Sequence, residues 1–199
     1  MIFPEIQLKK LKPDPEAWDP VCFVAQRKPS AVVVLFFVSE HKKTNILFIR
    51  RSTQVSSHKG QIGFPGGRLE AQDVRPSDTA LREAFEEIGL DPSRVTVLGA
   101  VDPVPALDGT LVFPIVCVTN TSVEELKINS DEVAEIYMIP LELVLESNRQ
   151  KFSFNMFGCW RQSYLYDCGP ISVWGLSAEI LGVAGFQAVI PTENSRLRS

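Results

Sequence analysis

The sequence has few of the residues on which several common kinds of site depend. Its 199 residues include only two histidines and four cysteines. The cysteines form no CxxC pair and no dense framework, whereas zinc centres and disulfide-rich folds need regular or close spacing. The sequence therefore indicates neither kind of site, and we expect reduced thiols at Cys22, Cys117, Cys159 and Cys168.

An excess of positive charge and long apolar runs are missing as well. Lys and Arg number 20 against 24 Asp and Glu, which gives a formal net charge of −4. Non-specific nucleic-acid binding needs a basic surface, so this partner is disfavoured. No apolar run reaches the roughly 20 residues of a membrane-spanning helix, and the first residues lack the pattern of a signal peptide. We expect a soluble cytoplasmic protein that acts on a small molecule, and the sequence leaves a homodimer open.

What the sequence does contain is a cluster of acids in residues 82–89, REAFEEIG. Residues three and four apart are neighbours on a helix, so Glu83 faces both Glu86 and Glu87. Like charges at this spacing cost roughly 0.2–0.5 kcal/mol per pair, and acids before a C-terminal glycine oppose the helix dipole. A divalent cation would reverse both penalties, because Mg²⁺ prefers oxygen ligands. A solvated acidic helix face is the alternative.

A glycine-rich turn lies shortly before these acids. Residues 63–67 are GFPGG, and glycine permits positive φ and close approach of the backbone to a ligand. We expect the helix to begin with Ser77 or Asp78 as its N-cap, because short polar side chains accept hydrogen bonds from the first free N–H groups. A turn and an acidic helix in this order predict a site in which main-chain groups and carboxylates meet.

The turn and the helix together resemble the sequence motif of the Nudix hydrolases. That motif has Gly, five residues, Glu, seven residues and then REUxEExGU, where U is hydrophobic. Here Gly67 is followed after five residues by Asp73 in place of Glu, and eight residues separate Asp73 from REAFEEIGL at 82–90. The helix half of the motif matches fully, and the loop half departs at these two points.

The resemblance implies a hydrolase site that binds Mg²⁺ or Mn²⁺. It makes Glu86 and Glu87 metal ligands, Glu83 a ligand or the group that activates water, and the Gly66 carbonyl a further ligand. It also implies that Arg82 holds the acids in place, whereas Arg82 on its own could be a simple i,i+4 partner of Glu86.

A second resemblance is to the coenzyme A pyrophosphatases within that family. Arg51-Ser52 and the segment HKGQIGFPGG at 58–67 match an element that these enzymes carry ahead of the motif, and Ser56 stands where they have an Arg. Segments 129–136 and 173–181 are similar as well. The resemblance implies substrate binding by Arg51, His58, Lys59 and Arg68. His58 is alternatively a surface residue, and Glu132 is either a water-activating base or a solvated acid.

The implied reaction is metal-dependent hydrolysis of the pyrophosphate in coenzyme A or its thioesters, which gives a phosphopantetheine product and adenosine 3′,5′-bisphosphate. One alternative is a Nudix hydrolase for another phosphoanhydride substrate, such as a nucleoside diphosphate sugar, a dinucleotide, a nucleoside triphosphate or an RNA 5′ end. The other is a non-catalytic Nudix module that only binds a nucleotide or a protein.

Hydrophobic patterns indicate an α/β domain. We expect strands at 31–38, 45–50, 95–99, 111–118 and 132–138, a turn at Asp108-Gly109 and a hairpin within 151–167 whose aromatic residues mostly lie in the core, as does Trp174. The Nudix resemblance implies an α/β/α sandwich around a mixed sheet, on which the acidic helix packs. The expected division is an N-terminal arm with a short helical piece (1–24), the Nudix domain (25–190) and a flexible tail (191–199).

Overall fold

The computed structural model describes residues 6–8, 10–18, 28–38, 44–54, 58–156 and 158–188. Several expectations concern residues outside these ranges and stay predictions: the thiol of Cys22, the role of Ser56 and the C-terminal tail.

The centre of the described part of the chain is a mixed eight-stranded sheet. Its main path is β4–β3–β2–β8–β6, and β5 pairs with β2, β7 with β8 and β9 with β3. Strands β2 and β8 are parallel, whereas the other pairs are antiparallel. The strands are β2 (Ser30–Val38), β3 (Thr44–Arg51), β4 (Ile62–Gly63), β5 (Gly66–Arg68), β6 (Val95–Ala100), β7 (Val104–Pro105), β8 (Leu111–Thr119) and β9 (Val133–Pro140).

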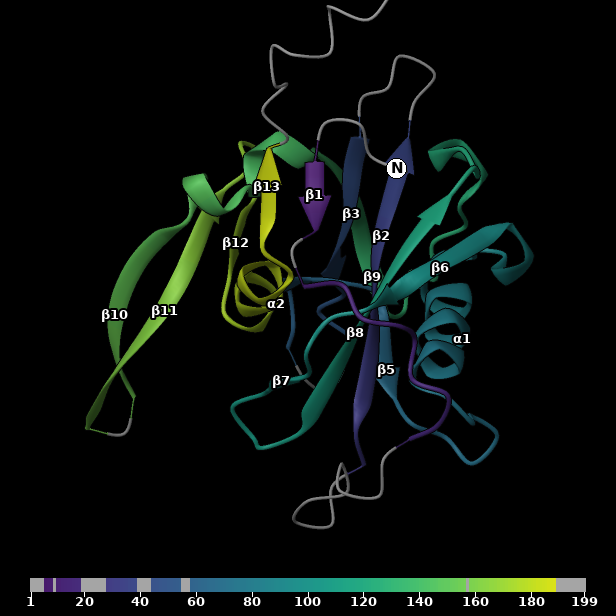
Figure 1. Ribbon diagram of the computed structural model, residues 1–199, viewed down its shortest axis with the longest axis horizontal. Helices are drawn as coiled ribbons and strands as arrows, with labels where there is room; N and C mark the ends of the chain where they lie inside the picture. The colour runs from purple at the N-terminus through teal and green to yellow at the C-terminus, as the bar shows by residue number, and fades with distance from the viewer. Residues whose placement is uncertain are drawn as a thin grey trace, which may run out of the picture.

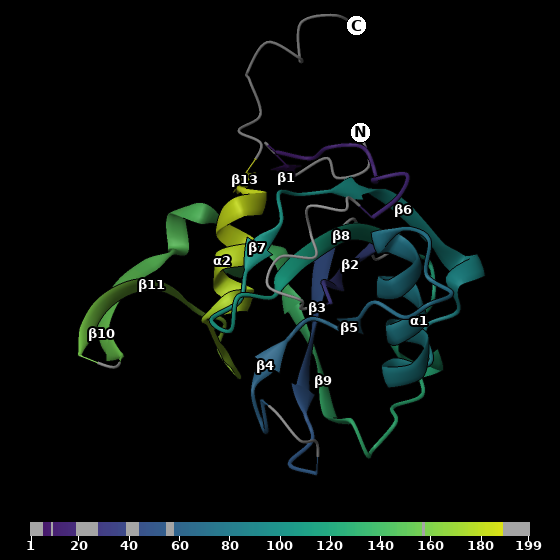
Figure 2. The ribbon, with the colours of Figure 1, turned by 90° about the horizontal axis from the view of Figure 1, so that it is seen from below.

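Side chains alternate between the faces of a strand, so the apolar residues of β2 and β3 give this sheet two apolar faces. Val33 and Leu47 lie on the face covered by α1 (Pro76–Ile88). Phe36 and Phe48 lie on the other face, which α2 (Leu176–Ala184) covers. The two helices lie on opposite sides of the sheet (Figure 2). The predicted α/β/α sandwich around a mixed sheet is confirmed.

The predicted strands are present with small changes at their ends. The expected turn is also found, because the backbone N–H of Gly109 donates to Ala106 between β7 and β8. Four 3-10 turns occur in the described ranges: Pro92–Arg94, Val123–Glu125, Leu141–Val144 and Glu146–Asn148. None of the helices in the described residues is long and apolar enough to cross a membrane. Cys117 and Cys168 are free thiols.

The acidic helix begins earlier than the sequence indicated. Its N-cap is Arg75, followed by Pro76 in the first turn, so the predicted N-caps Ser77 and Asp78 are wrong. Asp78 instead accepts backbone hydrogen bonds from Arg75 (2.9 Å) and Val74 (3.1 Å) from a position inside the helix. A proline at the first helical position needs no N–H partner, which favours this start. The helix ends as predicted at Gly89, with φ 67°.

A second, smaller sheet projects from the body. It has the order β10–β11–β12, with β10 (Gln150–Met156), β11 (Cys159–Asp167) and β12 (Ser172–Trp174), and the β10–β11 hairpin extends away from the main sheet (Figure 1). The hairpin was predicted, but the core role of most of its aromatic residues is wrong. Tyr166 is buried, whereas Trp160 is 75% exposed, and Trp174 on β12 is also exposed.

Residues near the two ends of the chain pair with each other. Strand β1 (Ile6–Leu8) is antiparallel to β13 (Phe186–Ala188), and Lys12 exchanges backbone hydrogen bonds with Ala100. The described residues of the predicted arm, 6–8 and 10–18, form this strand and an extended path, so the expected helical piece is not found among them.

Replacing Gly66 by alanine should destabilise the fold. Its φ is 152°, and a Cβ atom there would overlap the carbonyl oxygen of Ala31 and the backbone of Val32 on β2. Gly109→Ala is the matched control, because φ is 87° there and no atom lies within 4 Å of the added Cβ. We expect Gly66→Ala to lose about 1–3 kcal/mol more unfolding free energy than the control, measured by urea denaturation. Equal losses would contradict the close contact with β2.

Candidate active site

The last two turns of α1 carry the acids, and the chain is tied around this end of the helix. The backbone N–H of Asn129 donates to the carbonyl of Glu87, and that of Lys127 to the carbonyl of Ile88, both at 2.9 Å. These bonds satisfy carbonyls that a helix end leaves free. They also hold the segment that leads to Glu132 against the acidic helix.

Glu87 is the most deeply buried of the acids, with its side chain 1% exposed. Its two oxygens have different partners: the Arg51 guanidinium at 3.0 Å and the backbone N–H of Gly66 at 2.9 Å. Burial raises the pKa of Glu87 to about 7, although Arg51 and the Gly66 N–H act in the opposite direction. One carboxylate therefore connects α1 to the end of β3 and the start of β5.

Arg82 is the second connecting residue. Its guanidinium donates to Glu83 (3.0 Å), to Glu86 (3.2 Å), to both oxygens of Asp73 (3.0 and 3.2 Å) and to the carbonyl of Arg68 (3.0 Å). It is therefore much more than an i,i+4 partner of Glu86. This geometry fits the predicted role of Arg82 in holding the acids.

Asp73 was not among the predicted site residues, yet it supports Arg82. Its buried carboxylate accepts hydrogen bonds from Thr79 (2.7 Å) and from the backbone of Glu70 (2.9 Å), besides those from Arg82. Burial alone would raise the pKa of Asp73, but these donors together lower it. The signal for this role was its place at the first acidic position of the motif.

Glu83 lies directly over the glycine-rich segment. A Cβ atom on Gly67 would overlap the Glu83 carboxylate, so only glycine leaves room for it. Burial raises the pKa of Glu83, Arg82 opposes this effect, and the negative charges of Glu86 and Glu132 add to it. The charge of Glu132 acts on Glu87 in the same sense, so all four acids share one electrostatic environment.

These acids fit a divalent cation chemically. Within the described residues no three His, Cys, Asp or Glu side chains converge as a ready metal site; Arg82 and Arg51 hold carboxylate oxygens instead. Burial is the main cause of the raised pKa values of Glu83 and Glu87, and a cation beside these carboxyl groups would favour their charged form. Oxygen donors of this kind suit Mg²⁺ or Mn²⁺.

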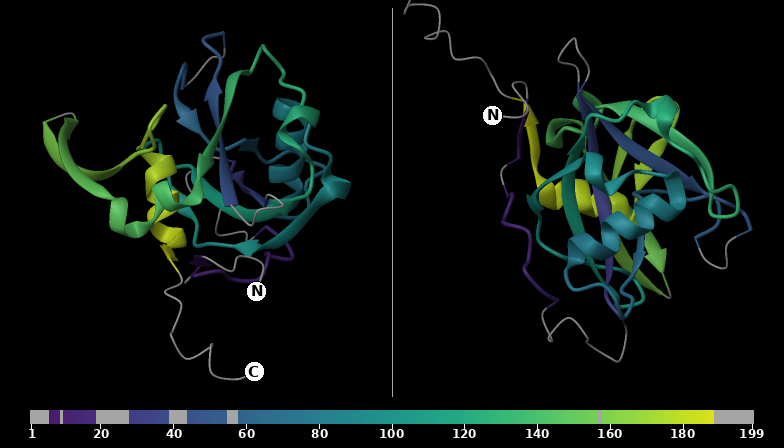
Figure 3. Two further views of the ribbon diagram at one scale, coloured as in Figure 1. Left: turned by 90° about the horizontal axis from the view of Figure 1, so that it is seen from above. Right: turned by 90° about the vertical axis from the view of Figure 1, so that its right-hand side faces the viewer.

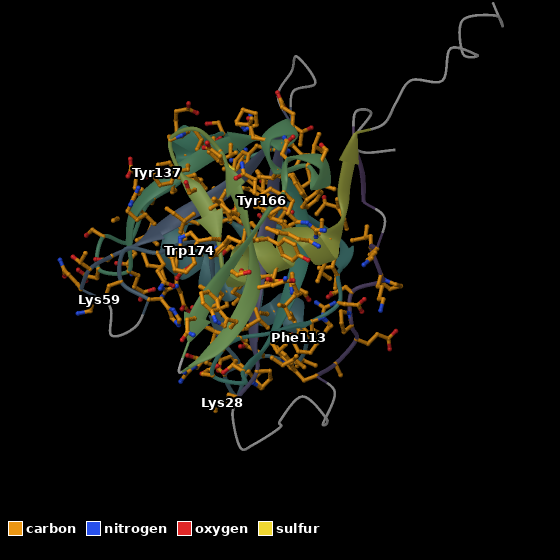
Figure 4. The ribbon with its side chains drawn as sticks, turned by 90° about the vertical axis from the view of Figure 1, so that its left-hand side faces the viewer. Lys28, Lys59, Phe113, Tyr137, Tyr166 and Trp174 are labelled. Carbon is orange, nitrogen blue, oxygen red and sulfur yellow. The ribbon has the colours of Figure 1, made fainter. Side chains whose placement is uncertain are left out.

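The other predicted substrate-binding residues lie further out. His58, with φ 57°, contacts the side chain of Gln61 at 3.0 Å. Lys59 lies at the outer end of the same loop and points away from the body (Figure 4). Arg68 is exposed beside Arg82. Of the four predicted substrate-binding residues, the structure brings Arg51 into contact with the acids and places Arg68 at their edge.

Comparisons with known proteins agree on one family. The family model for the NUDIX domain matches residues 27–157. "Uncharacterized Nudix hydrolase NudL" of Pectobacterium atrosepticum is 32% identical over 166 residues, which cover 79% of this chain and 81% of that protein. "Nudix hydrolase 15, mitochondrial" of Arabidopsis thaliana is 32% identical over 180 residues, covering 86% of this chain and 60% of that protein.

Two solved structures share the fold. The Nudix hydrolase RenU from M. smegmatis superposes with a TM-score of 0.50 at 21% identity and covers 59% of this chain and 73% of its own. A MutT/nudix family protein from Enterococcus faecalis also gives 0.50, at 17% identity, over 87% of this chain and 63% of its own. At such identities the likeness concerns the fold alone.

Asp73→Asn should loosen Arg82 and destabilise the protein. The Asp73 side chain is 3% exposed and that of Arg82 is 16% exposed, so the lost charge partner leaves a guanidinium with little solvent. Because Arg82 keeps Glu83 and Glu86, we expect a loss of about 1–3 kcal/mol at pH 7, measured by urea denaturation. The pKa of Asp73 is lowered, so the loss should shrink as the pH falls through that pKa. An exposed-site control, Asp131→Asn, should change little.

Glu87→Gln should change how stability depends on pH in the absence of metal. The pKa of Glu87 is raised to about 7 from an ordinary 4.5. The stability that comes from burying the protonated group is therefore complete below pH 4.5 and is lost as the pH rises through 7. In EDTA, the unfolding free energy of the variant relative to wild type should rise across this interval. A difference that stays constant from pH 4.5 to 7.5 would contradict a raised pKa at the buried Glu87 carboxyl group.

Proposed function

Since this chain belongs to the Nudix hydrolases, which act on pyrophosphate linkages, we propose that its substrate is coenzyme A or a coenzyme A thioester. Hydrolysis would give a phosphopantetheine product and adenosine 3′,5′-bisphosphate. One observation supports this substrate above all: the HKGQIGFPGG element at 58–67 leads directly into the acid cluster, where the Gly66 N–H bonds to Glu87.

Nudix hydrolases generally use Mg²⁺ or Mn²⁺. In this chain we assign the cation to Glu83, Glu86, Glu87 and the Gly66 carbonyl. A divalent cation at such a site neutralises phosphate oxygens and lowers the pKa of a bound water. These residues differ in accessibility, because Glu86 is exposed, Glu83 is half-buried and Glu87 is fully buried, so phosphate reaches the cluster from the Glu86 side.

Side chains in and around the acid cluster activate the water, position the acids and bind the substrate phosphates. A pyrophosphate repels a nucleophilic water, so a base must take the proton of that water. Glu83 or Glu132 has this role, and burial raises the pKa of Glu83. Arg82 keeps the acids in position through Asp73. Arg51, Arg68, Lys59 and His58 form the set from which we expect contacts to the substrate phosphates.

A different phosphoanhydride substrate remains the second candidate. Ser56 occupies a position where coenzyme A pyrophosphatases have an Arg, and the loss of that positive side chain changes which phosphate is held.

A module that only binds a nucleotide is less well supported, because Arg82, Glu83, Glu86 and Glu87 are all present and three of the acids contact an arginine. A cytoplasmic location stays a prediction from the sequence. A homodimer likewise stays a prediction.

Incubation with coenzyme A and Mg²⁺ should yield adenosine 3′,5′-bisphosphate, detected by mass spectrometry, and EDTA should abolish it. A panel with acetyl-coenzyme A, ADP-ribose, a dinucleoside polyphosphate and a nucleoside triphosphate tests the substrate class. Intact coenzyme A alongside cleavage of another compound would overturn the coenzyme A assignment and leave the pyrophosphatase in place.

Glu86→Gln should lower turnover by about 10²-fold or more, because the cluster loses one of its charged carboxylates. The side chain is exposed and glutamine has the same size, so the substitution leaves no buried cavity. The matched control is Glu142→Gln, an exposed acid on a 3-10 turn outside the cluster. We expect unchanged unfolding free energy in both variants. Full turnover by Glu86→Gln would show that the site assignment is wrong.

A further inference from the structure

The β10–β11 hairpin ends in an open strand edge. β10 is the outer strand of its three-stranded sheet, and within the described residues its strand partner is β11. The hairpin stands clear of the main sheet in Figure 1 and in the left view of Figure 3. Alternate residues of such a strand turn their backbone N–H and C=O groups to the free edge, where another strand can pair.

The residues of β10 are nearly symmetric about their centre. Gln150–Met156 has the sequence QKFSFNM, so Ser153 is flanked on both sides by a phenylalanine and then by a polar residue. Phe152 and Phe154 lie on the same face of the strand, with ring centroids 5.9 Å apart. Phe152 is 36% exposed. A strand of this pattern is complementary to an antiparallel copy of itself.

We propose that β10 pairs with β10 of a second copy of this chain, antiparallel and with the two-fold axis at Ser153. The two small sheets then form one continuous sheet. Phe152 lies opposite Phe154 of the partner subunit, and Phe154 opposite the partner subunit's Phe152, so four rings share one face. A closed two-fold contact of this kind uses the same patch on both subunits.

The charges of the strand agree with this register. Lys151 is the only charged residue in β10, and the register places it opposite Asn155 of the partner subunit. No like charges therefore face each other across the axis. A shift of the axis to the next pair of residues would break the match between the two phenylalanines. The strand edge is short, so the contact is that of a reversible dimer rather than an obligate one.

The dimer leaves the acid cluster open. The cluster belongs to α1, which lies across the main sheet from the small sheet and α2 (Figure 2). Self-association is therefore independent of the pyrophosphatase assignment, and loss of the dimer should leave turnover unchanged.

A pair of charge variants tests the register. In Phe152→Lys/Phe154→Lys, positive charges face each other across the axis, and the dimer should dissociate. In Phe152→Lys/Phe154→Glu, each lysine faces a glutamate of the partner subunit, and the dimer should persist. Light scattering after size exclusion, at micromolar concentrations, should give twice the chain mass for wild type and the Lys/Glu variant, and the single mass for the Lys/Lys variant.

Leu107→Ser is the control, because Leu107 is 73% exposed but lies outside the hairpin; this variant should remain dimeric. Monomeric wild-type protein would overturn the proposal. A Lys/Lys variant that stays dimeric would overturn it as well, because the contact would then use another surface. Circular dichroism checks that both double variants stay folded.

Cross-linking gives a second readout of the axis. Ser153→Cys places a cysteine opposite its own copy, and mild oxidation should produce a covalent dimer well above the wild-type background. Asn155→Cys faces Lys151 of the partner subunit, so it should produce far less. Equal cross-linking by the two variants would contradict an axis at Ser153.

Discussion

The burial of Glu87 is the constraint on which the rest of the site depends. A carboxylate out of water needs hydrogen bonds or an opposite charge, and here Arg51 and the Gly66 N–H supply them from two different strands. Gly66 donates this bond at a point where β5 runs so close to β2 that a Cβ would not fit. The position of the helix, the glycine-rich turn and the end of β3 are thus fixed by one group.

Arg82 organises the opposite side of the cluster in the same manner. It contacts two acids of the helix and is itself held by Asp73, which Thr79 and a backbone N–H fix in turn. Arg82 therefore stands between carboxylates that would otherwise repel one another, and Arg51 holds Glu87. This arrangement keeps the acids close together when no cation is bound, and the burial of Glu87 confines access to the exposed end of the cluster.

Local sequence patterns predicted the helices and strands. The features that were missed depend on contacts between residues far apart in the sequence. The apolar periods of β2, β3 and β8 and the spacing of Glu83, Glu86 and Glu87 follow from the geometry of single elements. The hydrogen bonds of Glu87 join it to residues 21 and 36 positions away in the sequence. The periodicity of side chains within a single helix or strand gives no sign of such contacts. The helix start was missed because Asp78 caps from inside the first turn. The β1–β13 pair was missed because it joins the ends of the chain.

The aromatic residues of the hairpin show a different limit. Alternation says which side chains share a face of a strand, but not whether anything covers that face. Tyr166 is covered by the core, whereas Trp160 and Phe152 are not. Exposure alone does not single out an interface, since Trp174 and Leu107 are exposed too. What distinguishes β10 is its nearly symmetric sequence around Ser153. A free strand edge with such a sequence can pair in antiparallel orientation with the same strand of another copy of the chain.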